Sequence, residues 1–151
     1  MKILLAIDGS AHSDEAVQTV VARPWPPETI VRVLSVVQHL RVPPPPGPAW
    51  AGGPGAPADE HLRTHAAIVV QAATEILRAH GLATETLVRT GDARAEIIDA
   101  ANEWPADLIV VGSRGLTGIK RWLLGSVAQF VVAHAQCSVE VVHKREVGRV
   151  A

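Results

Sequence analysis

Glycine and serine residues at a fixed spacing form the chain's strongest chemical pattern. Gly112-Ser113-Arg114-Gly115 is followed by nine residues and then by Gly125-Ser126. Glycine lets a backbone approach a ligand closely and adopt positive φ, and successive N–H groups in such a turn can bind an anion. A helix starting at Ser126 would add unpaired N–H groups and the positive end of its dipole. The pattern predicts a phosphate cradle; the alternative is that the glycines only turn the chain and cap a helix.

The cradle is not a Walker A loop, because no Gly-Lys-Ser/Thr follows at the required spacing.

A second candidate for a binding residue is Asp8, which ends the first apolar run and precedes Gly9-Ser10. Ligands of open parallel sheets bind outside the carboxyl ends of the strands, where the strand order reverses. A carboxylate beside phosphates would be repelled unless it bound a ribose hydroxyl or a bridging Mg²⁺. The alternative is that Asp8 caps the helix that follows.

The elements that must position these groups alternate along the chain. Short apolar runs predict buried strands at 3–7, 30–37, 82–88, 108–111 and 139–143. Apolar residues at helical spacing lie between these runs and predict four helices. This alternation predicts an α/β fold: an open five-stranded parallel sheet with helices on both faces. In the order 3-2-1-4-5, Asp8 and Gly112 would lie side by side, and the alternating run at 82–88 would be an exposed edge.

Composition limits the class of protein. The chain has 151 residues, of which 48% are hydrophobic and 19% charged, with a net charge of −1. It lacks the basic excess typical of nucleic-acid binders, and its apolar runs are too short for a membrane span or a signal core. Cys137 is the only cysteine, so we expect a reducing, cytoplasmic setting. We expect a single domain over 1–151, with a Pro/Gly-rich loop inserted at 43–57.

The chain resembles single-domain universal stress proteins over nearly its whole length, the Pro/Gly-rich loop excepted. The matching segments are 3–10, Thr90-Gly91-Asp92, 106–115 and 124–128, with Ala135 and Cys137. The glycine pattern is the most specific part, because it is the signature of the family members that bind ATP. The resemblance implies a Rossmann-like fold of the adenine nucleotide alpha hydrolase type.

The resemblance also implies a nucleotide site. Asp8 would contact ribose or Mg²⁺, and Ala6 and Val36 would lie against adenine. The approach to the ribose and phosphates would be lined by Val111 and Gly112, and the phosphates would be held by Gly115, Gly125, Ser126 and Val127. The family pairs as dimers through the last strand, here from Val139 to His143. Ala128 departs from the family, many of whose ATP-binding members carry a hydroxyl there.

Other polar residues have less specific interpretations. Arg114, Lys120 and Arg121 fall within the glycine segment and could neutralise phosphate charge or lie in solvent. His61 and His65 share a helix face but form no H-E-x-x-H motif, so we expect solvated side chains rather than a metal site. His134 is predicted to be a packed core histidine.

The functional expectation is a regulatory module. No G-x-S-x-G elbow or kinase signature occurs, and the third strand lacks the terminal aspartate of a receiver domain. We therefore expect an ATP-binding universal stress protein that signals to an unidentified protein partner through nucleotide-dependent ordering of residues 112–125, with at most slow ATP hydrolysis. The alternative is a homodimeric interaction module of the same fold that binds no nucleotide.

Overall fold

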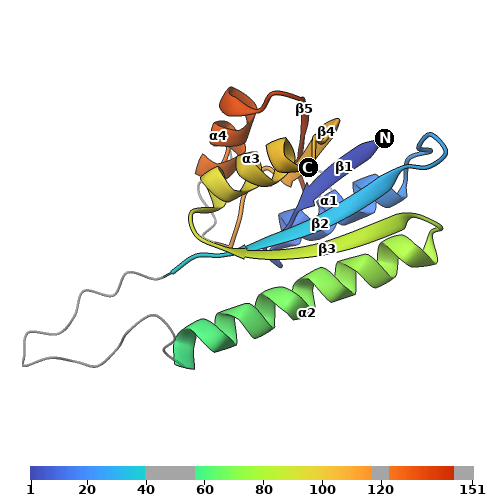
Figure 1. The fold of residues 1–151 in the computed structure, drawn as a ribbon. Helices are drawn as coiled ribbons and strands as arrows, with labels where there is room; N and C mark the ends of the chain where they lie inside the picture. The colour runs from blue at the N-terminus through green and yellow to red at the C-terminus, as the bar shows by residue number, and fades with distance from the viewer. Residues whose placement is uncertain (40–56, 117–122, 145–151) are drawn as a thin grey trace, which may run out of the picture.

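The computed structural model describes residues 1–39, 57–116 and 123–144. Strands and helices alternate, as the sequence predicts (Figure 1). The strands are β1 (Lys2–Ala6), β2 (Ile30–Val37), β3 (Ala83–Thr90), β4 (Leu108–Gly112) and β5 (Ser138–Val142). The helices are α1 (Ala11–Val21), α2 (Pro57–Ala79), α3 (Ala93–Glu103) and α4 (Ser126–His134). Apart from Pro57, which begins α2, the Pro/Gly-rich loop expected at 43–57 lies outside the described residues.

The strands form one parallel sheet in the order β3-β2-β1-β4-β5, which confirms the predicted topology. β1 lies in the middle, with Ala6 opposite Leu34 of β2 and opposite Val111 of β4. The chain order reverses between β1 and β4. The carboxyl ends of these two strands therefore meet where ligands of open α/β sheets bind.

Each face of the sheet carries its own apolar core, covered by its own pair of helices (Figure 1). On one face, α1 and α2 pack through residues such as Val17 and Leu77 onto Ile3 and Leu5. On the other face, α3 and α4 pack through Ile97 and Val131 onto Leu4 and Ile109. Burial on both faces explains why β1 and β4 are nearly continuous apolar runs.

The helix starts differ in how their first N–H groups are satisfied. Ser10 caps α1, because its Oγ accepts from the backbone N–H of Ser13 at 3.2 Å. Asp92 caps α3 by accepting from the N–H of Arg94 at 2.9 Å. Gly125 precedes α4 and offers no side-chain cap. The structure describes the N-cap residues of α1, α3 and α4, and of these three helices only α4 begins without a side-chain cap. The start of α4 belongs to the candidate site described below.

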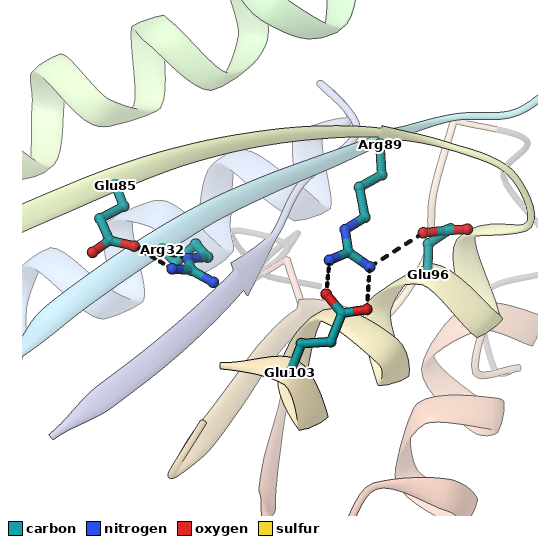
Figure 2. Close-up of polar contacts among 5 residues, drawn as sticks. All are labelled: Arg32, Glu85, Arg89, Glu96 and Glu103. Atoms are coloured by element: carbon teal, nitrogen blue, oxygen red, sulfur yellow. Dashed lines mark hydrogen bonds and ion pairs between the residues drawn. The ribbon is translucent and has the colours of Figure 1, made fainter. Parts of the chain in front are cut away.

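The prediction that β3 is an edge strand is confirmed. Ion pairs connect this strand to α3, because Arg89 contacts Glu96 and Glu103 (Figure 2).

The prediction that His134 is a packed core residue is wrong. Its ring is exposed and stacks on Phe130, because it lies in the last turn of α4, beyond the buried part of the helix. Within the described ranges, no helix is long and apolar enough to cross a membrane.

Candidate functional site

A pocket of about 400 Å³ opens at the carboxyl edge of the sheet, where the strand order reverses. All nine site residues predicted from the sequence line it: Ala6, Asp8, Val36, Val111, Gly112, Gly115, Gly125, Ser126 and Val127. They come from segments far apart in the chain. Parallel pairing of β1 with β2 and β4 brings the ends of these strands together.

The apolar part of the lining is wider than the sequence indicated. The lining residues that sequence reasoning missed include the apolar Leu34, Val37, Leu62, Ala66, Ala93 and Ile97 and the polar Ser35, Gln38 and His65. Three of them come from α2, which lies over the β2 side of the pocket, and two come from α3. The apolar stripes of these helices were visible in the sequence. Which part of each stripe would face a pocket depends on helix packing, which spacing along the chain does not encode.

The start of α4 presents unpaired donors to the pocket. Ser126, Val127 and Ala128 are its first residues, and all three line the pocket. The first N–H groups of an α-helix have no partner within the helix, and Gly125 supplies no side-chain cap. Together with the helix dipole, these donors favour an anion. Ala128 offers its N–H but no hydroxyl, so the departure from the family pattern leaves the helix terminus intact.

Ser113 adds a buried hydroxyl beside these donors. The residue is 1% exposed and lines the pocket. Its Oγ has no hydrogen-bond partner within the described part of the chain. Its backbone is well held, because its N–H donates to the carbonyl of Val142 at 2.8 Å and its carbonyl accepts from Gly125 at 2.7 Å. Since a buried hydroxyl without a partner costs stability, this atom is suited to an acceptor carried by a ligand.

The carboxylate of Asp8 connects the first and fourth strands. Its Oδ1 accepts from the backbone N–H of Ser10 at 2.9 Å, and its Oδ2 accepts from that of Leu116 at 3.0 Å. Asp8 therefore shapes the turn into α1, but Ser10 rather than Asp8 is the helix cap. Each carboxylate oxygen can accept more than one hydrogen bond. Asp8 can therefore hold a hydroxyl or a cation in the pocket while keeping both backbone contacts.

The three glycines of the pattern lie at close approaches that the sequence did not reveal. None has a positive φ; among the described residues near the site, that conformation belongs to Gly9. A Cβ on Gly112 would lie 2.9 Å from the backbone carbonyl carbon of His12, and one on Gly115 would lie 2.7 Å from Asp8 Oδ2. A Cβ on Gly125 would meet the carbonyl oxygen of Ser113 at 3.1 Å. The glycines thus allow close packing around the pocket, whether or not a ligand binds.

Other predicted residues contribute less or lie outside the described part. Lys120 and Arg121 are outside it, whereas Arg114 lines the pocket. His61 and His65 are both exposed, and within the described ranges no group of three metal-ligating side chains occurs. Burial raises the pKa of the Cys137 thiol, which makes the thiolate scarce at neutral pH.

Comparisons with known proteins agree with this architecture. The model of the universal stress protein family matches residues 1–143. The universal stress protein Sll1388 of Synechocystis sp. is 34% identical over 148 residues, which cover 93% of this chain and 96% of that protein.

Two solved structures share the fold. One is a family protein of Arabidopsis thaliana with AMP bound, with a TM-score of 0.69, 18% identity, and coverage of 96% of this chain and 92% of that one. The other is the universal stress protein of Archaeoglobus fulgidus in complex with dAMP, with a TM-score of 0.67, 23% identity, and coverage of 94% and 97%. With the parallel sheet and the family match over residues 1–143, these findings establish that the chain belongs to the universal stress protein family.

Proposed function

We propose that the pocket binds an adenine nucleotide and that the nucleotide is ATP. One observation carries the proposal: the uncapped start of α4 lines the same pocket as a wide apolar surface and as Ser113, whose buried hydroxyl has no partner in the described structure. Unpaired N–H and O–H donors suit phosphate oxygens, and apolar side chains suit a purine ring. The solved relatives with AMP and dAMP bound support an adenine nucleotide in this fold.

Each part of the nucleotide would contact its own group of site residues. Ala6 and Val36 lie against adenine, and the backbone of Val36 reads its edge. The ribose and the approach to the phosphates are lined by Val111 and Gly112. The phosphates are held by Gly115, Gly125, Ser126 and Val127.

Asp8 would contact ribose or a Mg²⁺ ion bound with the nucleotide. Mg²⁺ is commonly held by one or two carboxylates together with substrate phosphates and water. One carboxylate with free acceptor capacity fits that pattern, and a resident all-protein metal site is not required. The metal would neutralise phosphate charge beside Asp8, which would otherwise repel the ligand.

Binding would serve regulation rather than rapid turnover. Phosphoryl transfer needs an oriented nucleophile and positioned charges, and Asp8 is the one acidic side chain in the described lining of the pocket. We therefore expect at most slow ATP hydrolysis. Nucleotide occupancy would order the segment between Gly112 and Gly125 and so change the surface that a protein partner meets. Protection of this segment from proteolysis by saturating ATP would support the idea, and unchanged cleavage would contradict it.

A calorimetric titration of the nucleotide-free protein with Mg-ATP, AMP and Mg-GTP tests the proposal. We expect a micromolar Kd for ATP, roughly −8 kcal/mol, with weaker binding of AMP and of GTP. The variant Ser126→Ala should weaken ATP binding, whereas Ser138→Ala, at the amino end of β5, should not. If no nucleotide binds, the proposal fails and the homodimeric interaction module becomes the better description.

A further inference from the structure

Four basic residues lie on three neighbouring segments near the pocket, and the proposed roles above use none of them. They are His12 in the first turn of α1, Arg114 after β4, and His143 and Lys144 directly after β5. We call them the basic cluster.

Backbone contacts fix how these segments lie. Gly112 is in register with Val142 on the neighbouring strand, and the N–H of Ser113 donates to the Val142 carbonyl at 2.8 Å. Arg114, which follows β4, and His143, which follows β5, therefore lie on neighbouring segments beyond the carboxyl ends of these strands. The backbone of His12 lies against Gly112: a Cβ built on Gly112 would lie 2.9 Å from the carbonyl carbon of His12.

The electrostatics of His12 show that the positive charges act on one another. Burial, with the charges of Arg114, Lys144 and His143, lowers the pKa of His12, and Asp8 is the group that opposes this. Other titratable groups near its backbone are Asp14 and Glu15 on its own helix and His65 of α2, which borders Gly9. Arg114 and Lys144 thus each act on His12 more strongly than Asp8 does, and basic side chains gathered in this way favour an anion.

The cluster adjoins the pocket rather than forming a separate surface. Arg114 and Asp8 line the pocket, and so does Ser13, the residue after His12. The donors at the start of α4 are uncharged and lie across Gly112 and Ser113 from α1. They suit the first phosphate of a nucleotide. Each further phosphate adds negative charge, and charged donors bind such oxygens more strongly than neutral donors do.

We propose that this basic cluster binds the distal phosphates of a nucleoside polyphosphate whose first phosphate lies at the start of α4, through the charges of Arg114 and Lys144 and the ring N–H donors of His12 and His143. This inference rests on the proposed nucleotide site and adds to it a selectivity for the length of the phosphate chain. A nucleoside monophosphate would reach only the uncharged donors. A triphosphate would also reach the cluster, next to Asp8 and any Mg²⁺ held there.

The test compares ATP, ADP and AMP in calorimetric titrations of four variants at pH 7. Lys144→Gln and Lys144→Glu change the charge of the cluster. Lys2→Gln and Lys2→Glu are matched controls, because Lys2 lies at the opposite, amino-terminal end of β1. Thermal unfolding and sedimentation of each variant show that it is folded and keeps the oligomeric state of the parent.

We expect Lys144→Gln to raise the Kd of ATP by about two- to fivefold, as for an exposed ion pair. Lys144→Glu should raise it further, ADP should respond less, and AMP should not respond. The effect should shrink as salt is added. If ATP and AMP bind but their affinities change equally or not at all in the Lys144 variants, the cluster has no role in chain-length selectivity and this inference is overturned, while the nucleotide site stands. If neither binds to the parent protein, both proposals fail.

Discussion

Ser113 illustrates how a binding residue can weaken the fold that carries it. The hydroxyl is sealed from solvent and has no partner in the described part of the chain. An unsatisfied buried polar group costs about 1–3 kcal/mol. If a phosphate oxygen completes the hydrogen bond, the same atom costs stability in the free protein and contributes affinity in the complex.

We therefore predict that one substitution of Ser113 changes stability and ATP affinity in opposite directions. Ser113→Ala should stabilise the ligand-free protein by about 1 kcal/mol and weaken ATP binding. Urea denaturation measures the first effect and calorimetry the second. Ser35→Ala is a useful comparison, because Ser35 is also buried and lines the pocket, on the β2 side away from the start of α4. A loss of stability in Ser113→Ala, with unchanged ATP affinity, would show that the hydroxyl serves packing only.

The glycines show what could and could not be predicted from residue types. Their spacing indicated a site, and the structure places all three on one pocket. Their stereochemical reason was not predictable, because it lies in contacts with residues distant in sequence, such as Asp8 against Gly115. Gly115→Val would therefore displace Asp8 before it obstructed any phosphate. Lost binding in that variant would not by itself identify the phosphate contact.

At the scale of elements, α3 is held by charged side chains at its amino end and along the face that meets β3. Its amino end lines the pocket through Ala93 and Ile97. Asp92 caps that end, and the ionic contacts of Arg89 hold the helix to the edge strand β3 (Figure 2). A change at either place should act on stability through α3.

The cap predicts a specific dependence on pH. Hydrogen bonds from the Arg94 side chain and backbone lower the pKa of Asp92 to about 2. Because the folded-state pKa is depressed, the stabilisation is present above the unfolded pKa, near 4, and is lost as pH falls from about 4 towards about 2. Asp92→Ala should cost about 1 kcal/mol at pH 7, and less at pH 3.

Urea denaturation at pH 7, 5, 4 and 3 measures this difference. Asp92→Asn is the control, because it keeps an acceptor oxygen for the N–H of Arg94 but cannot titrate. It should lose less stability than Asp92→Ala at pH 7. A difference between Asp92→Ala and the parent that stayed constant down to pH 3 would contradict the assigned cap.

The Arg89 contacts predict a dependence on salt. Hydrogen bonding to Glu103 raises the pKa of Arg89, and Arg89 in turn lowers the pKa of Glu103. Arg89→Met should destabilise the protein by about 0.5–1 kcal/mol at low ionic strength, and by less at 1 M salt. Arg63→Gln removes a charge from an exposed position on α2 that has no ion pair in the described structure, so it should change stability little. Equal losses in the two variants would mean that the contacts of Arg89 do not hold α3.

For the whole molecule, the sequence sufficed to predict the strand order and the location of the pocket. Alternation of apolar strands and amphipathic helices restricts the topology, and the reversal of strand order locates the ligand crevice. The contributions of α2 and α3 to the pocket were not predictable. They depend on where each helix crosses its face of the sheet. That position is decided by side-chain packing between segments distant in the chain, such as α2 and β2, whose buried residues share one core cluster.

The two edges of the sheet lead to the last prediction. β3 is one edge, and its outer positions include the charged side chains Glu85 and Arg89, which discourage pairing with another strand. β5 is the other edge, and its valines Val139 and Val141 are only half-buried. We therefore propose that the chain forms a homodimer through β5. A two-fold axis there would place each substitution in the interface twice.

Val139→Lys and Val141→Lys should each raise the dimer dissociation constant by about tenfold or more, because a charge would be buried in the interface on both sides. Val88→Lys is the matched control, since it adds the same charge to the edge strand β3, where Val88 is exposed. Sedimentation equilibrium measures the association, and circular dichroism at the same concentrations shows whether each variant is folded. Because both β5 valines also touch the core beneath α4, a loss of pairing is inferred only from variants that circular dichroism shows to be folded. A monomeric parent protein, or folded β5 variants that dimerise as tightly as Val88→Lys, would exclude this edge as the interface.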